Sequence, residues 1–563
     1  MGLGVLDDKH LEHVPGTALL TDVIEADHHH RRGGLDTSLL KHGKGRDADV
    51  VLVPQPSRSP NDPLNWPLWK KDLMLFFICI DTAVVGAWGP MISPGYAQMA
   101  EEWNMSYNAL NGGLGWGVFV IGISCFFTNS LAVIWGRRPI FLLGNLLLFV
   151  SSVWAYFANS YNSLLASRLV GCIGMSPFEV LVTTTIADLY FVHQRGLRLA
   201  MWGLCLSVGV GGGTIISGYI IEDLGWNWTY GICAILYGVW ILILFFFCPE
   251  TAYRRDPSFN IDQGTQDRAE DLAEEKIARL EGKAENIENI SQTATNDSDW
   301  SEPKNSYWHD LKIYHGRQSD DPYWKVLTRP LLMLVFPQVL FSFFAYGLTT
   351  SWLIVVGSVL AQIFTAPPYS FSVSQVGLVT ISSLIGAIVG AFITGPLADW
   401  VVKFMSRRNG GIYEPEFRLV LISIALVLGG MSFFGFGWSL EVEDPWIGPV
   451  IFYGLQYFSV GFVTIAIYGY LTDCHRDKAP EAYAAINLRN IYSFGMNYVS
   501  LETWRSTLSH CSLTLRNSSS RPGSPRKARS KSSASLVASM SSFVCALFQC
   551  ISSANDAGVG RVA

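Results

Sequence analysis

Ionisable side chains lie inside long apolar stretches of this sequence, where a charge is costly unless it has a partner or a function. Asp81 lies near the middle of one apolar run, and Glu179 lies deep in another. A carboxyl group removed from water can exchange a proton near neutral pH, and it can also bind an organic cation. We therefore predict a site of proton exchange or cation binding at these two residues. The alternative is a structural hydrogen bond to a neighbouring helix.

Arg168 is a third charged group of this kind. An arginine within a membrane faces the protein interior or a water-filled cavity by default. Because Arg168 lies about one helical turn from the end of its apolar run, the alternative is that its side chain reaches out to the polar headgroups.

The elements that must position these groups are apolar runs long enough to cross a membrane, since a spanning helix needs ~20 mostly apolar residues. Ten runs have this length. They cover 72–93, 113–134, 139–158, 164–187, 199–221, 229–248, 331–356, 375–397, 418–437 and 446–469. An eleventh, 481–499, is weaker because Asn487, Arg489 and Asn490 interrupt it. A soluble core does not need ten such runs, so we predict an all-α, polytopic membrane protein.

The composition agrees with this class and excludes others. Of the 563 residues, 50% are hydrophobic and 15% are charged, whereas a soluble protein has about 25% charged residues. The net charge of −6 gives no reason to expect a nucleic-acid partner. The 10 Cys lack the spacing of a disulfide framework or a metal site, so we expect no metal and no other cofactor. The apolar runs also lack the His, Cys or acidic cluster that a membrane enzyme would need.

A polar segment divides the apolar runs into six and a second set, as in two-halved secondary transporters. The predicted divisions are a cytoplasmic N-terminal tail at 1–71, a six-helix bundle at 72–248, a cytoplasmic central loop at 249–330, a second bundle at 331–499 and a Ser-rich basic tail at 500–563.

The connectors between the runs alternate in charge. Those after the odd-numbered runs contain no Lys or Arg and carry acids such as Glu222 and Asp444. Those after runs 2, 4, 8 and 10 carry basic residues such as Arg137, Arg198 and Lys403. Because cytoplasmic loops are enriched in Lys and Arg, we expect a cytoplasmic N-terminus, and we expect the plasma membrane as the location.

Two stretches carry a resemblance to a known family. Asn61-Asp-Pro-Leu-Asn-Trp-Pro67 precedes the first run, and Asn409-Gly-Gly-Ile-Tyr-Glu-Pro-Glu-Phe-Arg-Leu419 follows Gly395-Pro-Leu-Ala-Asp399-Trp400 after the eighth. Over about residues 60–499, the chain resembles the major facilitator superfamily. Within it, the chain is similar to the fungal twelve-span group of drug:proton antiporters and of polyamine and cation transporters. The resemblance implies the major facilitator fold of two six-helix bundles.

The resemblance also implies gating residues in two cytoplasmic loops. Gly136-Arg137-Arg138-Pro139 occupies the place of the superfamily's loop motif, where glycine permits a tight turn and the arginines pair with acids or helix ends. The alternative is that these arginines only set the topology. The second-half counterpart provides Gly395, Asp399, Arg407 and Arg408. Because the first copy has Asn129 and Val133 where the family pattern has Gly and Asp, we expect charge pairing mainly in the second loop.

Spans 4 and 5 carry further expectations. Arg168 resembles the family's span-4 arginine, which is linked to proton coupling. Gly209, Gly213 and Gly218 in span 5 permit two helix backbones to approach closely. Thr214 stands where antiporters of this family have a proline, which leaves symport and uniport open beside antiport.

Polar residues of the second half complete a predicted cavity. Gln338 and Tyr346 lie in span 7, and Asn487 and Asn490 lie in span 11. We predict that they line the cavity because their polar atoms need partners within the membrane. An aromatic wall beside acids suits a hydrophobic cation, which binds to the face of an aromatic ring.

The resemblance ends after Val499. The family should supply a twelfth span there, but 500–535 is Ser-rich and basic. We therefore expect an incomplete second bundle, with a tail that arises from a frameshift, a retained intron or a faulty gene model.

Taken together, these features predict a monomeric secondary active transporter rather than an enzyme. Its expected partners are a small organic solute (a drug, polyamine or other organic cation), protons and the lipid bilayer. It would work by alternating access with proton coupling. The alternative is a non-transporting protein of the same fold, either a sensor or a truncated gene product.

Overall fold

The computed structural model describes residues 18–19, 56–57, 59–253, 305–319, 321–408, 412–475 and 479–495. The predicted atypical tail lies outside the described residues. Within them the chain is helical, apart from one two-residue antiparallel pairing of β1 (Ala18–Leu19) with β2 (Ile412–Tyr413). The predicted all-α class is therefore confirmed.

Ten helical segments of the described part of the chain are long and apolar enough to cross a membrane. Six of them form what we call the first half. They are α1 (Leu68–Trp88), α3 (Tyr107–Trp135), α4 (Arg138–Tyr156), α5 (Tyr161–Leu189), α6 (Val192–Leu224) and α7 (Trp226–Phe247). Shorter helical turns at η4 (Pro63–Asn65), η5 (Ser93–Gly95) and α2 (Tyr96–Glu102) flank α1.

The other four spanning segments belong to the second half. They are α11 (Pro337–Thr365), α12 (Val373–Val379) with α13 (Ile381–Arg408), α14 (Val420–Glu441) and α15 (Ile447–Cys474). Short helices α9 (Tyr307–Asp310), α10 (Tyr323–Met333) and η8 (Pro415–Leu419) flank these segments. The weak eleventh run contains α16 (Ala479–Asn487) and further helix at 489–495.

Local residue chemistry explains where these helices begin and end. Ser106 caps α3 by accepting a hydrogen bond from the backbone N of Ala109, at 3.3 Å, and Ser160 caps α5 in the same way. Gly136 ends α3 with a φ of +98°, a conformation that residues with a side chain rarely adopt. Pro139 lies in the first turn of α4, where its missing N–H leaves no bond unmade.

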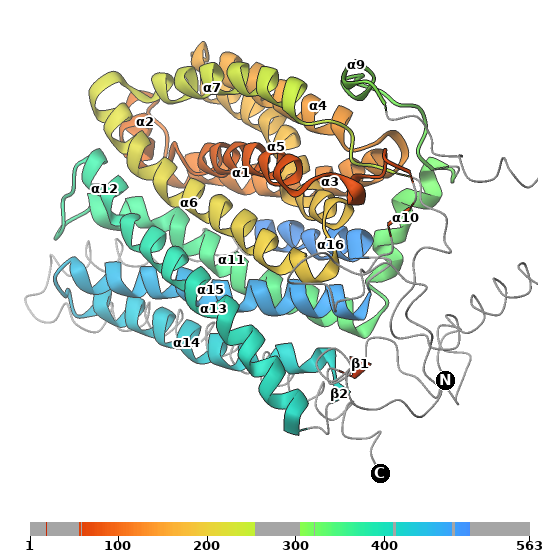
Figure 1. Ribbon diagram of the computed structural model, residues 1–563. Coiled ribbons are helices and arrows are strands. Elements are labelled where there is room, and N and C mark those ends of the chain that lie inside the picture. The colour runs from red at the N-terminus through yellow and green to blue at the C-terminus, as the bar shows by residue number, and fades with distance from the viewer. Residues whose placement is uncertain are drawn as a thin grey trace, which may run out of the picture.

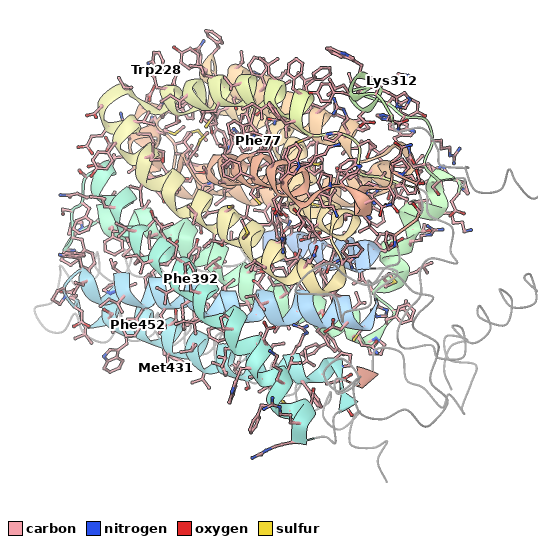
Figure 2. The ribbon with its side chains drawn as sticks, in the orientation of Figure 1. Phe77, Trp228, Lys312, Phe392, Met431 and Phe452 are labelled. Carbon is pink, nitrogen blue, oxygen red and sulfur yellow. The ribbon has the colours of Figure 1, made fainter. Side chains whose placement is uncertain are left out.

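The helices form two packed groups, and Figure 1 shows the first half above the second, with α6, α11 and α16 lying between them. Each half has its own buried apolar clusters. Large apolar side chains also cover the outside (Figure 2): Phe392 is 72% exposed and Met431 is 57% exposed. Because lipid is the solvent for such a surface, this pattern fits a protein embedded in a membrane.

The connectors gather by charge at the two ends of the helices. We call the end with 136–138, 190–198 and 403–408 the basic end, and the end with 101–106, 222–225 and 442–446 the acidic end. In Figure 1, α9 and α10 mark the basic end and α2 and α12 mark the acidic end.

The glycines of α6 lie at close helix contacts. A Cβ added to Gly209 would lie 2.0 Å from the Ala83 carbonyl oxygen, and one added to Gly213 would lie 2.4 Å from the Ala87 Cβ. These two positions therefore allow α6 to pack against α1. Gly218 faces α12, where its added Cβ would lie 3.3 Å from the Gly377 Cα. Thus α6 contacts a helix of its own half and a helix of the other half.

Candidate functional site

Glu179 lies on the face of α5 that meets the second half. Its neighbours Phe178 and Val180 are fully buried, whereas Glu179 keeps part of its surface accessible. One carboxylate oxygen, Oε2, accepts a hydrogen bond from Asn490 Nδ2 at 3.1 Å. This bond joins the two halves of the protein through two residues that the sequence predicted for the site.

Asn490 continues the contact into the second half. Its Oδ1 accepts a hydrogen bond from Arg489 at 3.0 Å, and the same guanidinium nitrogen donates to Thr350 Oγ1 at 3.1 Å. The guanidinium also lies over the Tyr346 ring, 4.4 Å from its centroid. We call Glu179, Asn490, Arg489, Thr350 and Tyr346 the interface network. It places an acid, an amide, a permanent cation and an aromatic face together within the membrane-spanning part of the protein.

Two glycines allow the helix that carries this network to approach its neighbours. A Cβ added to Gly122 of α3 would lie 3.0 Å from the Asn490 Cβ, and one added to Gly347 of α11 would lie 3.2 Å from the Arg489 Cβ. Phe494 then packs on Trp116 of α3, with ring centroids 4.9 Å apart. The segment 489–495 therefore packs between α3 of the first half and α11 of the second.

Asp81 has different surroundings from Glu179. It is 0% exposed, and its Oδ2 accepts a hydrogen bond from Asn145 Nδ2 of α4 at 2.8 Å. Its other oxygen has no hydrogen-bond partner within the described residues. Asp81 and Asn145 both belong to the first half. The geometry therefore matches the alternative given in the sequence analysis, a structural hydrogen bond between spans. The contacts of Asp81 and Glu179 have no residue in common, and the structure does not join the two acids into one site.

Arg168 points into the first half. Its side chain is 7% exposed, and its guanidinium donates to the Gly89 carbonyl at 2.7 Å and to the Tyr96 hydroxyl at 3.3 Å. The ring of Trp88 lies 5.8 Å from the guanidinium carbon. The side chain is therefore directed into the protein, and it ties α5 to the segment that follows α1.

The remaining predicted cavity residues lie in the second half. Tyr346 packs edge-on against Tyr468, with ring centroids 5.6 Å apart. Asn487 donates only to the Tyr483 carbonyl of its own helix, and its Oδ1 has no partner among the described residues. The Gln338 Oε1 is likewise buried without a described partner. Of the four predicted cavity residues, Tyr346 and Asn490 belong to the interface network.

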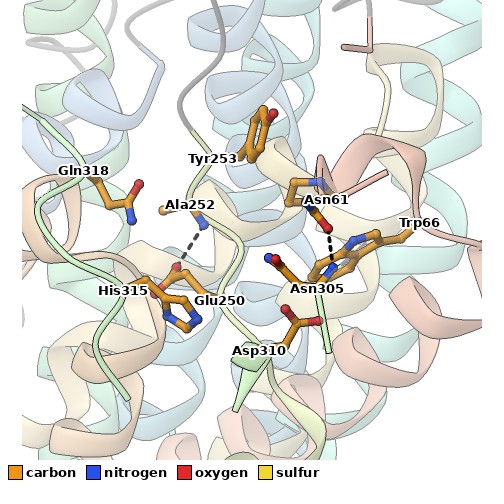
Figure 3. Close-up of a pocket in the computed structure, with 10 residues that line it drawn as sticks. Asn61, Trp66, Glu250, Ala252, Tyr253, Asn305, Asp310, His315 and Gln318 are labelled. Carbon is orange, nitrogen blue, oxygen red and sulfur yellow. Dashed lines mark hydrogen bonds between the residues drawn. The ribbon is translucent and has the colours of Figure 1, made fainter. Parts of the chain in front are cut away.

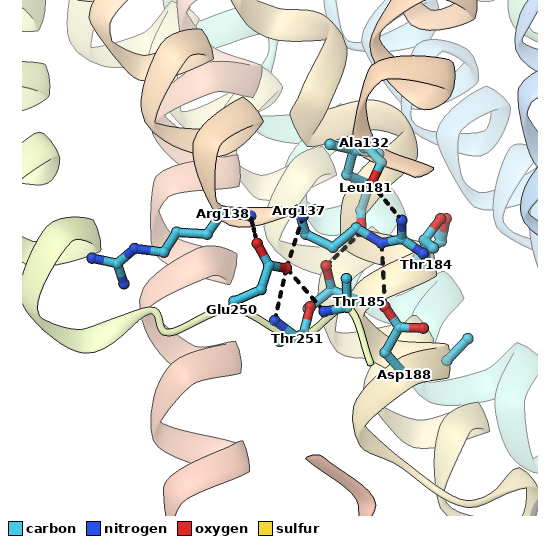
Figure 4. A network of polar contacts seen from close by, with 12 residues as sticks. Ala132, Arg137, Arg138, Leu181, Thr184, Thr185, Asp188, Glu250 and Thr251 are labelled. Carbon is cyan, nitrogen blue, oxygen red and sulfur yellow. Dashed lines mark hydrogen bonds and ion pairs between the residues drawn. The ribbon is translucent and has the colours of Figure 1, made fainter. Parts of the chain in front are cut away.

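At the basic end, the first-half loop forms a network of charged contacts (Figure 4). The backbone N–H groups of Arg137 and Arg138 donate to Glu250, at 2.8 and 3.1 Å, and Arg137 also forms an ion pair with Asp188 at 3.2 Å. Arg138 donates to the carbonyls of Phe245 and Cys248 at the end of α7. A Cβ on Gly136 would lie 2.3 Å from Glu250 Oε2, so this loop requires glycine.

The second-half loop shows fewer such contacts in the part that the structure describes. Asp399 and Arg407 are exposed, Gly395 has open space beside it, and Arg408 lies over the ring of Phe404. The ion pair nearest in the chain joins Arg418 to Asp473 at 2.6 Å. The expectation that charge pairing lies mainly in the second loop stays a prediction, because part of that loop lies outside the described residues. The sequence analysis did not identify Glu250, which lies just past the end of α7 and supplies the first loop with a carboxylate.

A cavity of about 490 Å³ opens beside Glu250 at the basic end (Figure 3). Its lining comes from the stretch 61–67 before α1, the end of α7 and the segment around α9. The lining residues are Asn61, Pro63, Trp66, Glu250, Ala252, Tyr253, Asn305, Asp310, His315 and Gln318. The Asn61 Oδ1 accepts a hydrogen bond from the Asn305 backbone N at 2.9 Å, which ties the two chain segments together. At the same end, burial raises the pKa of Tyr190, whose hydroxyl donates to Asp72 at 2.8 Å.

Further contacts join the halves toward the acidic end. The Thr214 and Thr380 hydroxyls lie 2.7 Å apart, so α6 is hydrogen-bonded to the break between α12 and α13. Asn111 of α3 donates to the Ser358 carbonyl at 3.3 Å, and Glu222 accepts from the Ser374 backbone N at 2.8 Å. Thr214 therefore makes an inter-half bond that a proline at this position could not make.

Arg489 is a member of the interface network that the sequence analysis did not single out. The sequence analysis treats it only as one of three polar interruptions of a weak span. The rule applied to Arg168, that an arginine within a membrane faces the interior or a cavity, applies equally to Arg489 and would have identified it.

Comparisons with known proteins identify the family of the chain. The profile of the Major Facilitator Superfamily matches residues 73–496. An uncharacterized MFS-type transporter of Schizosaccharomyces pombe is 26% identical over 509 residues, which cover 86% of this chain and 85% of that protein. Protein HOL1 of Saccharomyces cerevisiae is 26% identical over 519 residues, covering 85% of this chain and 87% of that protein.

A solved structure of the proton:xylose symporter XylE bound to 6-bromo-6-deoxy-D-glucose has a TM-score of 0.49 and 15% identity, and it covers 85% of this chain and 97% of that one. The family match extends over most of the chain and covers all or most of every spanning helix described above. This chain therefore belongs to the major facilitator superfamily and is a multi-pass membrane protein of a class that transports small solutes.

Proposed function

We propose that this protein is a proton-coupled secondary transporter of a small organic cation, such as a hydrophobic drug cation or a polyamine, that works by alternating access. The observation that carries the proposal is the hydrogen bond between Glu179 of the first half and Asn490 of the second. Alternating access requires the two halves to move relative to each other around a central site. A titratable group that bonds across their interface is suited to couple that movement to a proton.

Protonation of Glu179 changes the bond that it makes across the interface. The ionised carboxylate accepts a hydrogen bond from Asn490 Nδ2, and a hydrogen bond to a charged group is worth about 1.5–3 kcal/mol. The neutral acid accepts more weakly. Proton binding therefore alters the free-energy difference between the conformations that keep this bond and those that break it, which is the requirement for coupling.

The surroundings of Glu179 suit a cationic solute. The carboxylate supplies the opposite charge, and the Tyr346 ring, which lies in the same network, supplies an aromatic face. A cation over such a face gains about 0.5–2 kcal/mol. In this proposal Asp81 holds α1 to α4 and Arg168 holds α5 to the end of α1, so neither residue contacts the solute.

We propose further that the protein lies in the plasma membrane and works as a monomer. In this proposal its basic end faces the cytoplasm. The support is the concentration of Lys and Arg in the connectors of that end. The Arg137, Arg138, Glu250 and Asp188 contacts would then hold the cytoplasmic end of the first half in one conformation, and would break when that end opens.

Transport into vesicles tests the proposal. The purified protein is reconstituted with the membrane potential clamped, and uptake of tetraphenylphosphonium and of spermidine is measured with and without a pH gradient. We expect the gradient to accelerate movement of at least one probe by the unaltered protein, and Glu179→Gln to remove the acceleration. Gradient-driven movement by Glu179→Gln at the unaltered rate would overturn the role of Glu179. Absence of movement of either probe under any gradient would favour the non-transporting alternative.

A further inference from the structure

Arg489 is held differently from Arg137, Arg168 and Arg418, three other buried or paired arginines among the described residues. Arg418 and Arg137 form direct ion pairs with Asp473 and Asp188, at 2.6 and 3.2 Å. Arg489 forms neither an ion pair nor a bond to a main-chain carbonyl within the described residues. Its two hydrogen bonds share one nitrogen, and its Nε is buried without a partner. This contrasts with Arg168, whose two hydrogen bonds leave from two different nitrogens and whose acceptors include a main-chain carbonyl.

The position of Arg489 coincides with the place where a cationic solute would bind. Its guanidinium occupies the face of Tyr346, and it reaches Glu179 only through the Asn490 amide, which accepts from Arg489 and donates to Glu179. The opposite charges of Arg489 and Glu179 are thus kept one amide apart. Because arginine does not lose its proton in proteins, the positive charge at this site is permanent.

We propose that Arg489 is a resident competitor of the transported cation: it occupies the cation position in the empty site, and its charge prevents a proton and a cationic solute from binding together. This inference rests on the proposed function. With Glu179 ionised, the empty site has no net charge. One proton or one monovalent solute brings it to a single positive charge, and both together would bring it to two within a poorly screened interface.

The consequence is a specificity rule for the solute. A solute that places its positive group on Tyr346 must displace the guanidinium, which then needs other acceptors or water. Such displacement is feasible because Arg489 has few bonds to lose, whereas Arg418 would have to break a direct ion pair. Proton and solute then alternate at the site, which is the behaviour of an exchanger.

Direct binding tests this inference. The purified full-length protein in lipid nanodiscs is titrated with tetraphenylphosphonium at pH 8. The readout is binding, so no transport is needed. Removing the nearby positive charge by Arg489→Gln should tighten binding by roughly tenfold to a hundredfold, the size expected for one like charge at short range in a partly screened site. Arg489→Lys keeps the charge and should bind as weakly as the unaltered protein. Lys325→Gln removes an exposed charge on α10 and serves as the matched control.

A second pair of variants gives a result even where Arg489→Gln is poorly folded. Glu179→Gln leaves an uncompensated positive charge and should bind tetraphenylphosphonium least. Glu179→Gln combined with Arg489→Gln restores neutrality and should bind at least tenfold more tightly than Glu179→Gln alone, on the same estimate. Tighter binding on losing a side chain is not a result of a damaged fold.

The outcomes separate this inference from the function on which it rests. If Glu179→Gln weakens binding but loss of Arg489 does not strengthen it in either background, Arg489 is not a competitor and the proposed function survives. If Glu179→Gln binds tetraphenylphosphonium as well as the unaltered protein, the proposed cation site at Glu179 is wrong and the inference is overturned with it.

Discussion

Asp81 and Glu179 are both carboxylates within long apolar helices, but they lie in different regions of the molecule. Asp81 is sealed inside the first half, where Asn145 of α4 holds it. Glu179 lies between the halves, keeps accessible surface and bonds to Asn490 of the second half. The comparison teaches that depth in the membrane does not by itself make an acid suitable for coupling. The acid must also lie where the protein changes shape.

The two intramembrane arginines repeat the contrast. Arg168 is sealed in the first half and donates to a main-chain carbonyl and a tyrosine hydroxyl. Arg489 lies at the interface, and its Nε has no hydrogen-bond partner among the residues that the structure describes. Substitutions in the sealed region should therefore affect folding, whereas substitutions in the interface network should affect transport of a folded protein.

The largest effect is expected from a change in the sealed region. A Cβ added to Gly171 would lie 2.3 Å from the Trp88 ring and 2.6 Å from Ser151 Oγ, so Gly171→Val should prevent close packing of α5 on α1 and α4. Overpacking of this kind costs about 1–3 kcal/mol or more, and we expect little folded protein in fluorescence-detected size-exclusion chromatography. Gly203→Val is the control because Gly203 has open space beside it. A folded Gly171→Val protein would weaken the contrast.

A smaller effect is expected from a change in the interface network. Asn490→Ala removes the bond to Glu179 across the halves without placing a larger side chain there. Loss of a hydrogen bond to a charged group should lower gradient-driven transport by roughly tenfold to a hundredfold. The melting temperature should change little, and a fall in melting temperature with unchanged transport would reverse the assignment.

The inter-half bond of Thr214 should have a more modest effect. Thr214→Val keeps the shape of the side chain but removes the hydroxyl that bonds to Thr380. Because one neutral hydrogen bond contributes about 1 kcal/mol, we expect a change of roughly fivefold in the balance between conformations. Accelerated or slowed transport of this size, measured in vesicles, would show that the bond breaks during the cycle. An unchanged rate would place Thr214 outside the moving interface.

The smallest effect is expected at the sealed acid. Asp81→Asn keeps an oxygen that accepts from Asn145 and removes a charge that has no second partner within the described residues. We expect gradient-driven transport to stay within about twofold of the unaltered rate, since the substituted amide still makes the bond between α1 and α4. Loss of proton coupling in this variant, with the fold intact, would move the coupling site from Glu179 to Asp81.

Much of the fold followed from the sequence because the membrane imposes a length and a polarity on each spanning helix. The ten runs were visible in this way, and the family was visible from its resemblance at 61–67, 395–400 and 409–419. The difference in surroundings between Asp81 and Glu179 could not be predicted from the sequence, because a helix in a membrane is apolar on its lipid face and on its packed face alike. Which side of α1 or α5 meets Asn145 or Asn490 depends on contacts distant in the chain.

The partners of Arg489 and Glu250 could not be predicted from the sequence either. Arg489 was visible as a charge in a weak span, but its partners Thr350 and Tyr346 come from α11. Glu250 lies just past the end of α7, and only the folded chain brings it beside Gly136. Residue types can thus be read from the sequence, whereas their pairing across helices requires the structure.

The most direct test of the central claim compares water access at the two acids. In a chain whose native cysteines are replaced, Glu179→Cys and Asp81→Cys are exposed separately to a small, water-soluble thiol reagent in sealed vesicles. Reaction needs a thiolate that water can reach. The interface position of Glu179 predicts modification at 179 and none at 81. Modification at 81 as fast as at 179, in folded protein, would contradict the separation of a sealed acid from a coupling acid.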